Sequence, residues 1–373
     1  MSVAIVRARD PSECSKALSL LGGIERFVSR GDRVVIKPNV CAPRTSRSGA
    51  VTDPELVAAL CRLVADCGGR PMVAESPIFP FPSSVAFRVG GYADFKTRYG
   101  FPLVDVDSDK AVRITIRDAA VLESEVISKK VLEADLLINV PVMKNHVHTR
   151  VTLGLKNIKG VVPGRNKHII HLKGLDEGIV DLNTVVKSRL VVVDAIVGME
   201  GMLSPVNGRP KRMNLIVAGD NIVETDAVCC RIMGYDPRSV RHVFLAEQRG
   251  LGRMAGMEVV GESVEAVRSP FAFYDRPRSL TSVAGRLGWS AWNWGYNQIA
   301  KRFGRDILDA RQEERGEWVW DPERCIRCKM CLEGCPVSAL RLESDRIVRD
   351  EKACIYCYCC AELCPQAAIT KRL

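Results

Sequence analysis

Short apolar runs recur along the first part of the chain, and stretches with helical spacing of apolar positions separate them. Several runs are apolar at every position, which is typical of strands buried on both faces of a sheet. The pattern therefore predicts an α/β fold, with a mainly parallel sheet and flanking helices. The expected strands are Val3–Val6, Val34–Ile36, Met72–Val73, Leu103–Val106, Leu136–Val140, Leu190–Val193 and Leu215–Val217.

Capping signals place three of the expected helices. Pro11 precedes a helical pattern over residues 12–27, and Asp53 precedes another over residues 54–67. A third helix is expected over residues 222–233.

The C-terminal end repeats one cysteine pattern, C-x2-C-x2-C-x3-C-P, at an offset of 29 residues. This is the bacterial ferredoxin spacing, in which three thiolates of one repeat and the fourth of the other hold a 4Fe-4S cluster. A zinc ribbon also uses C-x2-C pairs, but it gives no role to the third cysteine of each repeat. The sequence therefore predicts two 4Fe-4S clusters. The expected ligands are Cys325, Cys328, Cys331 and Cys364 for cluster 1, and Cys354, Cys357, Cys360 and Cys335 for cluster 2.

The composition changes between the α/β pattern and the cysteine repeats. All five tryptophans lie between residues 289 and 320, and residues 278–305 contain five Lys and Arg and no acid. We expect a helical linker whose rings pack the two parts together. An amphipathic helix in contact with a membrane surface is the alternative. The predicted division is 1–277 as an α/β substrate-binding domain, 278–320 as a Trp- and Arg-rich helical linker, and 321–373 as a small α+β ferredoxin-like domain.

Size and composition are those of an ordinary globular protein. The 373 residues are 47% hydrophobic, which is enough for a large core. No apolar run reaches membrane-spanning length, and the N-terminus lacks the pattern of a signal peptide. We therefore expect a cytoplasmic protein, with peripheral membrane contact through residues 278–305 as the alternative.

Polar residues gather where the expected strands end. The carboxyl ends of parallel strands share one edge of a sheet, where ligands bind in open α/β folds, although caps and turns also place polar residues there. Lys37 would anchor a carboxylate or a phosphate. The other expected substrate-binding residues are Asn39, Asn145, Asn157, His171 and Glu200.

Residues 144–173 form a basic segment. They contain seven Lys and Arg, four of the five histidines, and no acid. Cations and glycine amides at this density favour a small anionic ligand, and a solvated basic face is the alternative. A metal site of paired histidines with Glu200 or Asp194 is weaker, because the surrounding cations repel a dication. Nucleic acid is disfavoured as a partner, because only 6% of the residues are aromatic.

Four stretches of the chain resemble the domain-of-unknown-function family number 362. They are residues 33–55, 140–160, 194–201 and 220–226, and they include Arg33-Val34-Val35-Ile36-Lys37-Pro38-Asn39, Thr52-Asp53-Pro54 and Leu155-Lys156-Asn157. That family often carries a double-cluster ferredoxin module at one end. The resemblance implies an iron–sulfur protein of redox metabolism, and it supplies no settled substrate.

The leading hypothesis is a ferredoxin-dependent reductase. An external ferredoxin or another low-potential donor would reduce the clusters, which would pass electrons to a small anionic substrate in the α/β crevice. Lys144 and Lys156 would stabilise the added negative charge, and His146 or His168 would return the proton.

Two alternatives stay open. The chain is then either a non-catalytic electron carrier or assembly partner, or a non-redox enzyme of phosphoryl or acyl chemistry with the clusters as support. The second alternative would use Mg2+ held by Asp194, Glu200 or Asp226. A flavin is also left open, although the chain has no G-x-G-x-x-G fingerprint. The oligomeric state does not follow from the sequence.

Overall fold

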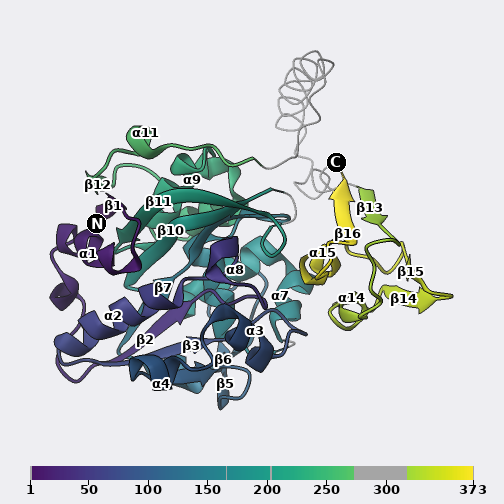
Figure 1. Cartoon of the computed structure of the whole chain (residues 1–373), viewed down its shortest axis with the longest axis horizontal. Coiled ribbons are helices and arrows are strands. Elements are labelled where there is room, and N and C mark those ends of the chain that lie inside the picture. Colours follow the sequence, from purple (N-terminus) through teal and green to yellow (C-terminus); the bar gives the residue numbers. More distant parts are fainter. Residues whose placement is uncertain (1, 165, 202–203, 273–316, 373) are drawn as a thin grey trace.

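The computed structural model describes residues 2–164, 166–201, 204–272 and 317–372. They form a large α/β body and a small C-terminal module beside it (Figure 1). The predicted linker, residues 278–320, lies outside the described residues except for its last four positions.

The body is built around one mixed sheet whose core strands are parallel. β2 pairs in parallel with β3 and β7, and β7 pairs in parallel with β10, whereas β11 runs antiparallel to both β1 and β10. The predicted mainly parallel α/β fold is confirmed. The order across the sheet is β12 (Glu258–Gly261), β1 (Ser2–Arg7), β11 (Arg209–Gly219), β10 (Leu190–Glu200), β7 (Leu136–Val140), β2 (Arg33–Pro38), β3 (Arg70–Glu75) and β4 (Leu103–Asp105), and β8 (Val142–His146) joins β10 to β9 (Arg150–Val151).

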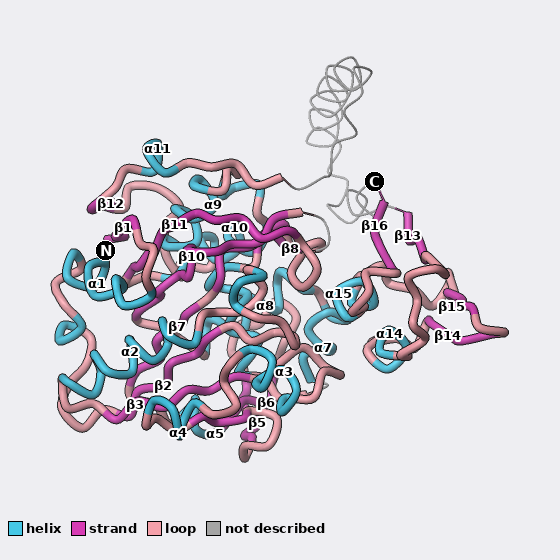
Figure 2. Tube along the Cα trace, viewed as in Figure 1, coloured by secondary structure: helices cyan, strands magenta, loops and turns pink. Residues whose placement is uncertain are grey.

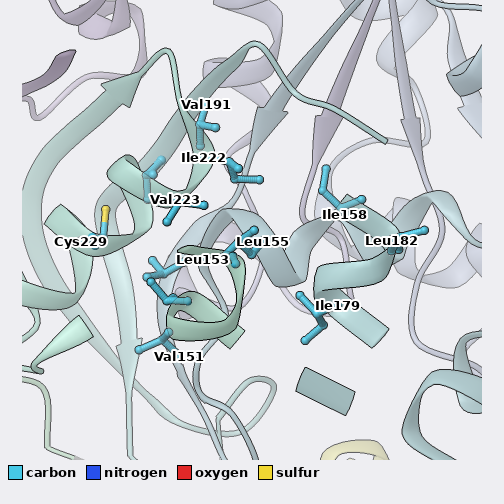
Figure 3. Packing of buried hydrophobic residues seen from close by; sticks show 14 of the residues in the cluster. Val151, Leu153, Leu155, Ile158, Ile179, Leu182, Val191, Ile222, Val223 and Cys229 are labelled. Atoms are coloured by element: carbon cyan, nitrogen blue, oxygen red, sulfur yellow. The ribbon is translucent and has the colours of Figure 1, made fainter. Parts of the chain in front are cut away.

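Helices cover both faces of the sheet, as Figure 2 shows. Alternate strand residues feed two separate cores, because successive side chains of a strand point to opposite faces. Val3 and Ile5 belong to one core, and Ala4 and Val6 to the other. One face carries α1 (Cys14–Leu20), α2 (Pro54–Asp66) and α3 (Ser83–Gly90), and the other carries α6 (Leu153–Asn157), α8 (Leu175–Val185), α9 (Ile222–Ile232) and α10 (Arg241–Gln248). Figure 3 shows the packing around Leu155 and Val223 on the second face.

Local signals fix where these helices begin. The Asp53 side chain accepts a hydrogen bond from the backbone of Glu55 at the start of α2, which begins at the predicted residue. Asn221 caps α9 in the same way. The helix expected over residues 12–27 is shorter, because α1 ends before Gly22 and Gly23, which both have positive φ. The remaining α-helices and strands described in the body are α4 (Phe95–Tyr99), α5 (Lys129–Leu132), α7 (Asn166–Lys173), α11 (Val264–Val267) and the hairpin of β5 (Ala111–Thr115) and β6 (Ser124–Ser128).

The C-terminal module consists of two antiparallel strand pairs and two short helices. β13 (Glu317–Trp320) pairs with β16 (Ile369–Arg372), so the module begins at least at Glu317 rather than at the predicted residue 321. Its other elements are β14 (Leu340–Glu343), β15 (Arg346–Arg349), α14 (Met330–Glu333) and α15 (Cys359–Leu363).

The module packs against the body through apolar contacts and backbone hydrogen bonds. Leu363 of α15 lies in one buried cluster with Ala42, Phe81 and Val206 of the body. Asn207 donates from Nδ2 to the carbonyl of Cys364 at 2.7 Å. These contacts place α15 next to α7 of the body (Figure 1).

Candidate functional site

A pocket lies between the sheet and the C-terminal module. Its walls come from the carboxyl ends of β2 and β3, from β8, from residues 152–171 and from α15. It encloses about 640 Å³ of empty space, its open mouth included. The charged residues that line it are Lys37, Lys144, Lys156, Lys159, Lys167, Glu75 and Glu362. This surplus of lysines favours an anionic ligand.

One wall of the pocket is a closed hydrogen-bonded network. Lys37 donates from Nζ to Glu75 Oε2 at 2.7 Å and to Asn157 Oδ1 at 3.2 Å, and Asn39 donates from Nδ2 to the same Asn157 oxygen at 2.8 Å. Burial lowers the pKa of Lys37, and the adjacent Glu75 opposes that shift. Gly160 packs on this ion pair so closely that a Cβ atom would overlap both side chains. Lys37, Asn39 and Asn157, which the sequence predicts as substrate-binding residues, therefore line the pocket. Their polar atoms already form hydrogen bonds with other protein groups.

Lys144 is also fully engaged by the protein. Its Nζ donates to Asn39 Oδ1 at 2.7 Å, to the carbonyl of Ala50 at 2.5 Å and to Cys41 Sγ at 3.3 Å. The side chain is completely buried. Lys144 thus contributes positive charge to the pocket and supports its wall, and its donors are already used.

Lys156 and Thr152 offer polar atoms that the described residues do not use. Within the described part of the chain, no acceptor contacts Lys156 Nζ, and Thr152 Oγ1 is buried without a partner. Burial lowers the pKa of Lys156, which the charge of Glu362 opposes. Buried polar groups in proteins are normally paired, so the unpaired hydroxyl of Thr152 beside the ammonium of the half-buried Lys156 indicates a ligand site on this wall.

Lys159 and His171 form a pair of nitrogen atoms 2.7 Å apart in the same pocket. Burial, together with the positive charge of Lys156, lowers the pKa of Lys159 to about 7. Burial also holds the pKa of His171 well below its usual value, so the imidazole is neutral and accepts from the lysine. Such a pair can hold and release a proton near neutral pH.

His146 connects the body to the module. Its Nδ1 accepts from the backbone N–H groups of His148 and Thr149 at 3.1 and 3.2 Å, so the proton resides on Nε2. That nitrogen lies 2.9 Å from Glu362 Oε1 of α15, off the axis of a well-formed hydrogen bond. Burial lowers the pKa of His146 to about 3. Burial alone would raise the pKa of Glu362, but His146, with Lys156 and Lys159, lowers it to about 2.

A neutral imidazole therefore faces a carboxylate across the junction. Nδ1 of His146 is occupied by backbone N–H groups, Nε2 faces Glu362, and the residue does not line the pocket, whereas the sequence predicts it as a proton donor to the substrate. The geometry gives His146 a positioning role instead. The side chain of His168, the other expected proton donor, lies outside the described residues.

Two expected substrate-binding residues lie away from the pocket. Asn145 donates from Nδ2 to the carbonyl of Ala272 at 2.9 Å, and Glu200 accepts from the backbone N–H of Ala272 at 3.0 Å and from Lys211 Nζ at 3.2 Å. The cause for Asn145 is the alternation of β8, in which Lys144 and His146 point to one face and Asn145 to the other.

The expected Mg2+ ligands are not brought together. Asp194 accepts from the backbone of Asp53, and Asp226 accepts from the backbone of Gly154 and Leu155 at 2.7 and 2.8 Å. Burial raises the pKa of each of these two carboxyl groups to about 7. Among the described residues, no three His, Cys, Asp or Glu side chains are placed to hold one metal ion. The two aspartates instead accept hydrogen bonds from backbone N–H groups.

Sequence reasoning misses several pocket residues. Lys159 and Lys167 lie in the basic segment and Glu75 ends a buried strand, so charge and position were available as signals. Cys359 and Glu362 carry no comparable signal. Their place in the pocket depends on how the module packs against the body.

Two further hollows lie inside the module, and four cysteines line each of them. Their empty space, the open mouths included, is about 370 and about 340 Å³. Four thiols around a void suit a cubane better than a single ion, so these residues fit two 4Fe-4S clusters. The first hollow has Cys335, Cys354, Cys357 and Cys360, and the second has Cys325, Cys328, Cys331 and Cys364.

The backbone repeats with the cysteines. Left-handed residues in the first repeat recur at an offset of 29 in the second, and such turns direct backbone N–H groups at an anion. Ala339 donates to Cys335 Sγ at 3.2 Å, and Ala368 donates to Cys364 Sγ at 3.1 Å. The left-handed residues are Arg327, Lys329 and Ser338, then Tyr356, Tyr358 and Ala367.

Comparison with known proteins gives matches for both parts. Residues 317–365 match a family described as a 4Fe-4S dicluster domain, and residues 34–231 match one described as Domain of unknown function (DUF362). The "Thylakoid-associated protein sll1697" of Synechocystis sp. (strain ATCC 27184 / PCC 6803 / Kazusa) is 30% identical over 266 residues, which cover 68% of this chain and 81% of that protein.

A solved structure gives a weaker match. The lactate racemase apoprotein of Thermoanaerobacterium thermosaccharolyticum aligns with a TM-score of 0.38 and 12% identity. The aligned part covers 58% of this chain and 53% of that one, so this chain spans about half the length of that protein. In the part of the chain that the structure describes, no helix is both long and apolar enough to cross a membrane. The C-terminal module is a 4Fe-4S dicluster domain, and the chain belongs to the family described as Domain of unknown function (DUF362).

Proposed function

We propose that this protein is an iron–sulfur reductase that binds a small anion in the pocket and reduces it. One observation carries the proposal, namely that a single pocket has cationic side chains on one wall and the cluster-binding module on another. Lys156 and Lys159 line it from the body, and Cys359 and Glu362 line it from α15. Cys359 directly precedes Cys360, a residue of the first hollow. A bound anion would therefore lie next to this cluster site.

The free groups on the body would bind the anion. The Lys156 ammonium and the Thr152 hydroxyl would contact it, and the positive charges of Lys37 and Lys144 would stabilise it from behind. Because water is partly excluded from the pocket, these charges would act more strongly than at an exposed surface.

Reduction of a C=C or C=O bond of the anion would consume one proton for each electron. When bound, the clusters supply single electrons, which an external ferredoxin or another low-potential carrier restores as it is oxidised. For each electron that the substrate gains, Lys159 would donate one proton and recover it from solvent. His171 accepts from Lys159 and would hold the ammonium in place.

The experiment starts from anaerobic, cluster-loaded protein that dithionite has reduced and from which excess dithionite has been removed. It is mixed with a set of small carboxylates and phosphorylated acids while the cluster absorbance is followed. We expect an anion of this class to reoxidise the clusters with a stoichiometric amount of reduced product. Lys156→Gln should lower kcat/KM by roughly 10- to 150-fold, because a charged hydrogen bond contributes about 1.5–3 kcal/mol.

Lys187→Gln is the matched control, because Lys187 is exposed and does not line the pocket. Two outcomes would contradict the proposal. Reoxidation by a protein carrier alone, with no effect of any anion, would identify an electron carrier. Conversion of an anion while the clusters remain oxidised would identify a non-redox enzyme.

A further inference from the structure

The two cluster sites are built from matching positions. Each residue that lines the hollow around Cys357 has a counterpart, 29 positions away, that lines the hollow around Cys328. The backbone donors also match, because Ala339 and Ala368 each donate to a cysteine sulfur. A difference between the two cluster sites can therefore be traced to those paired positions at which the residue types differ.

The first difference is a buried charge. Arg349 lines the hollow around Cys357, and its side chain is only 12% exposed. The guanidinium donates to Glu351 at 3.1 Å and contacts Cys354, yet its Nη1 is buried and has no acceptor among the described residues. At the counterpart position the other hollow has Trp320, whose buried indole N–H is neutral and likewise lacks a described acceptor.

Aromatic rings fix the Arg349 guanidinium in place. Its central carbon lies 5.4 Å from the centroid of the Trp318 ring and 4.8 Å from that of Tyr356. A cation held between two rings has little freedom to turn to solvent. The unpaired Nη1 therefore requires an acceptor inside the hollow, and a sulfur of the bound cluster would supply one.

The second difference is a hydrogen bond to a ligand sulfur. Trp318 donates from Nε1 to Cys360 Sγ at 3.4 Å. The counterpart of Trp318 in the other hollow is Ile347, which has no side-chain donor. The hollow around Cys357 thus has one more N–H donor and a buried cation. The hollow around Cys328 is lined by two cations, Arg327 and Lys329, but both are exposed, and Arg327 pairs with Asp345 at 3.3 Å. Solvent therefore screens their charges more than it screens that of Arg349.

Both differences favour the reduced form at the same site. Reduction adds negative charge to a cluster, and a nearby cation or N–H donor stabilises that charge. Burial opposes the effect, because Cys328 is exposed whereas Cys357 is half-buried. Because the same burial excludes water and salt, the charge of Arg349 is little screened. It therefore attracts the negative charge of a reduced cluster more strongly than an exposed cation would.

We infer that Arg349 and Trp318 make the cluster site of Cys335, Cys354, Cys357 and Cys360 the higher in reduction potential. Electrons that enter the module would then settle at the site that adjoins the pocket through Cys359. The inference concerns the module alone, so it stands whether or not the pocket reduces an anion.

The test is an anaerobic redox titration of the cluster-loaded protein, followed by electron paramagnetic resonance without any substrate. We expect two separate potentials in the wild type. Arg349→Gln should shift the higher potential downward and leave the lower one in place, and Trp318→Phe should shift the same potential by less. Arg341→Gln is the matched control, because it removes a positive charge from an exposed side chain of the same module that lines neither hollow.

Iron analysis of each variant verifies that both clusters are bound. If Arg349→Gln fails to hold one cluster, Arg349→Lys and Trp318→Phe decide the question, since the first keeps the charge and the second keeps the cation but loses the N–H donor. Three results would overturn the inference. They are equal potentials in the wild type, a shift confined to the lower potential, or shifts in Arg349→Gln and in Trp318→Phe that are no larger than in Arg341→Gln.

Discussion

Lys159 illustrates how a single residue acquires chemistry from its surroundings. An exposed lysine remains charged at neutral pH, but burial and the neighbouring Lys156 lower the pKa of Lys159 to about 7. Glu362 and Cys359 of α15 oppose this shift, and Lys167 adds to it. At neutral pH the side chain of Lys159 is therefore present partly as the ammonium and partly as the amine.

We expect kcat/KM for anion reduction to fall as the pH rises through about 7. Below that pH Lys159 has the proton that the substrate needs, and above it the amine has none to give. A pH–rate profile of cluster reoxidation checks this. The fall of kcat/KM above about pH 7 should be absent in Lys159→Met and present in Lys187→Met. A fall at the same pH in Lys159→Met would show that another group supplies the proton.

At the residue scale, the sequence predicts which charges gather at the site but not which of them remain free. Lys37, Asn39, Lys144, Asn157 and His171 all line the pocket, because strand ends and the basic segment meet there. Whether a lysine is paired depends on partners far away in the chain. Lys144 finds acceptors in residues 39–50, whereas Lys156 in the same basic segment finds none among the described residues.

At the element scale, the short 3-10 turn Ile158–Val161 sets the shape of the pocket. It passes so close to the ends of β2 and β3 that only a glycine fits at position 160, where a Cβ atom would overlap Glu75 and Lys37. The turn also contains Lys159, so its position decides where the proton-carrying amine lies.

Gly160→Ala should therefore weaken anion binding and lower stability by about 1–3 kcal/mol, as overpacking does elsewhere. Thermal unfolding and the anion assay measure the two effects. Gly164→Ala is the control in the same loop. An added Cβ there meets no atom within 4 Å, so it incurs only the left-handed strain of about 1 kcal/mol. A loss in Gly160→Ala no larger than that in Gly164→Ala would contradict the crowding of the ion pair at position 160.

The sequence predicts best the strands that consist of buried apolar runs and the helices that begin after a capping residue. The apolar runs at Leu136–Val140, which Asn139 interrupts, and at Leu190–Val193 lie in β7 and β10, and the capped helix at Pro54 begins as expected. The antiparallel direction of β11 is not encoded in its apolar pattern, because a strand buried on both faces has the same composition in either direction. The pairing of β13 with β16 joins residues that are far apart in the chain, so the module boundary also could not be predicted.

At the scale of the whole molecule, packing of the module against the body completes the site. Leu363 packs into an apolar cluster of the body, Asn207 donates to the backbone of Cys364, and the neutral His146 faces the Glu362 carboxylate. These contacts bring α15 to the pocket and so place the residues around Cys360 beside the lysines. The central claim is that this arrangement brings the cationic pocket within electrostatic reach of one cluster.

The redox titration of Lys156→Gln tests that claim most directly, because it requires no knowledge of the substrate. Removing a positive charge beside a cluster disfavours its reduction. The account predicts that one of the two reduction potentials falls in Lys156→Gln while the other remains, and that neither changes in Lys187→Gln. Two unchanged potentials in a fully loaded Lys156→Gln protein would contradict it, because the pocket would then lie outside the electrostatic reach of both clusters.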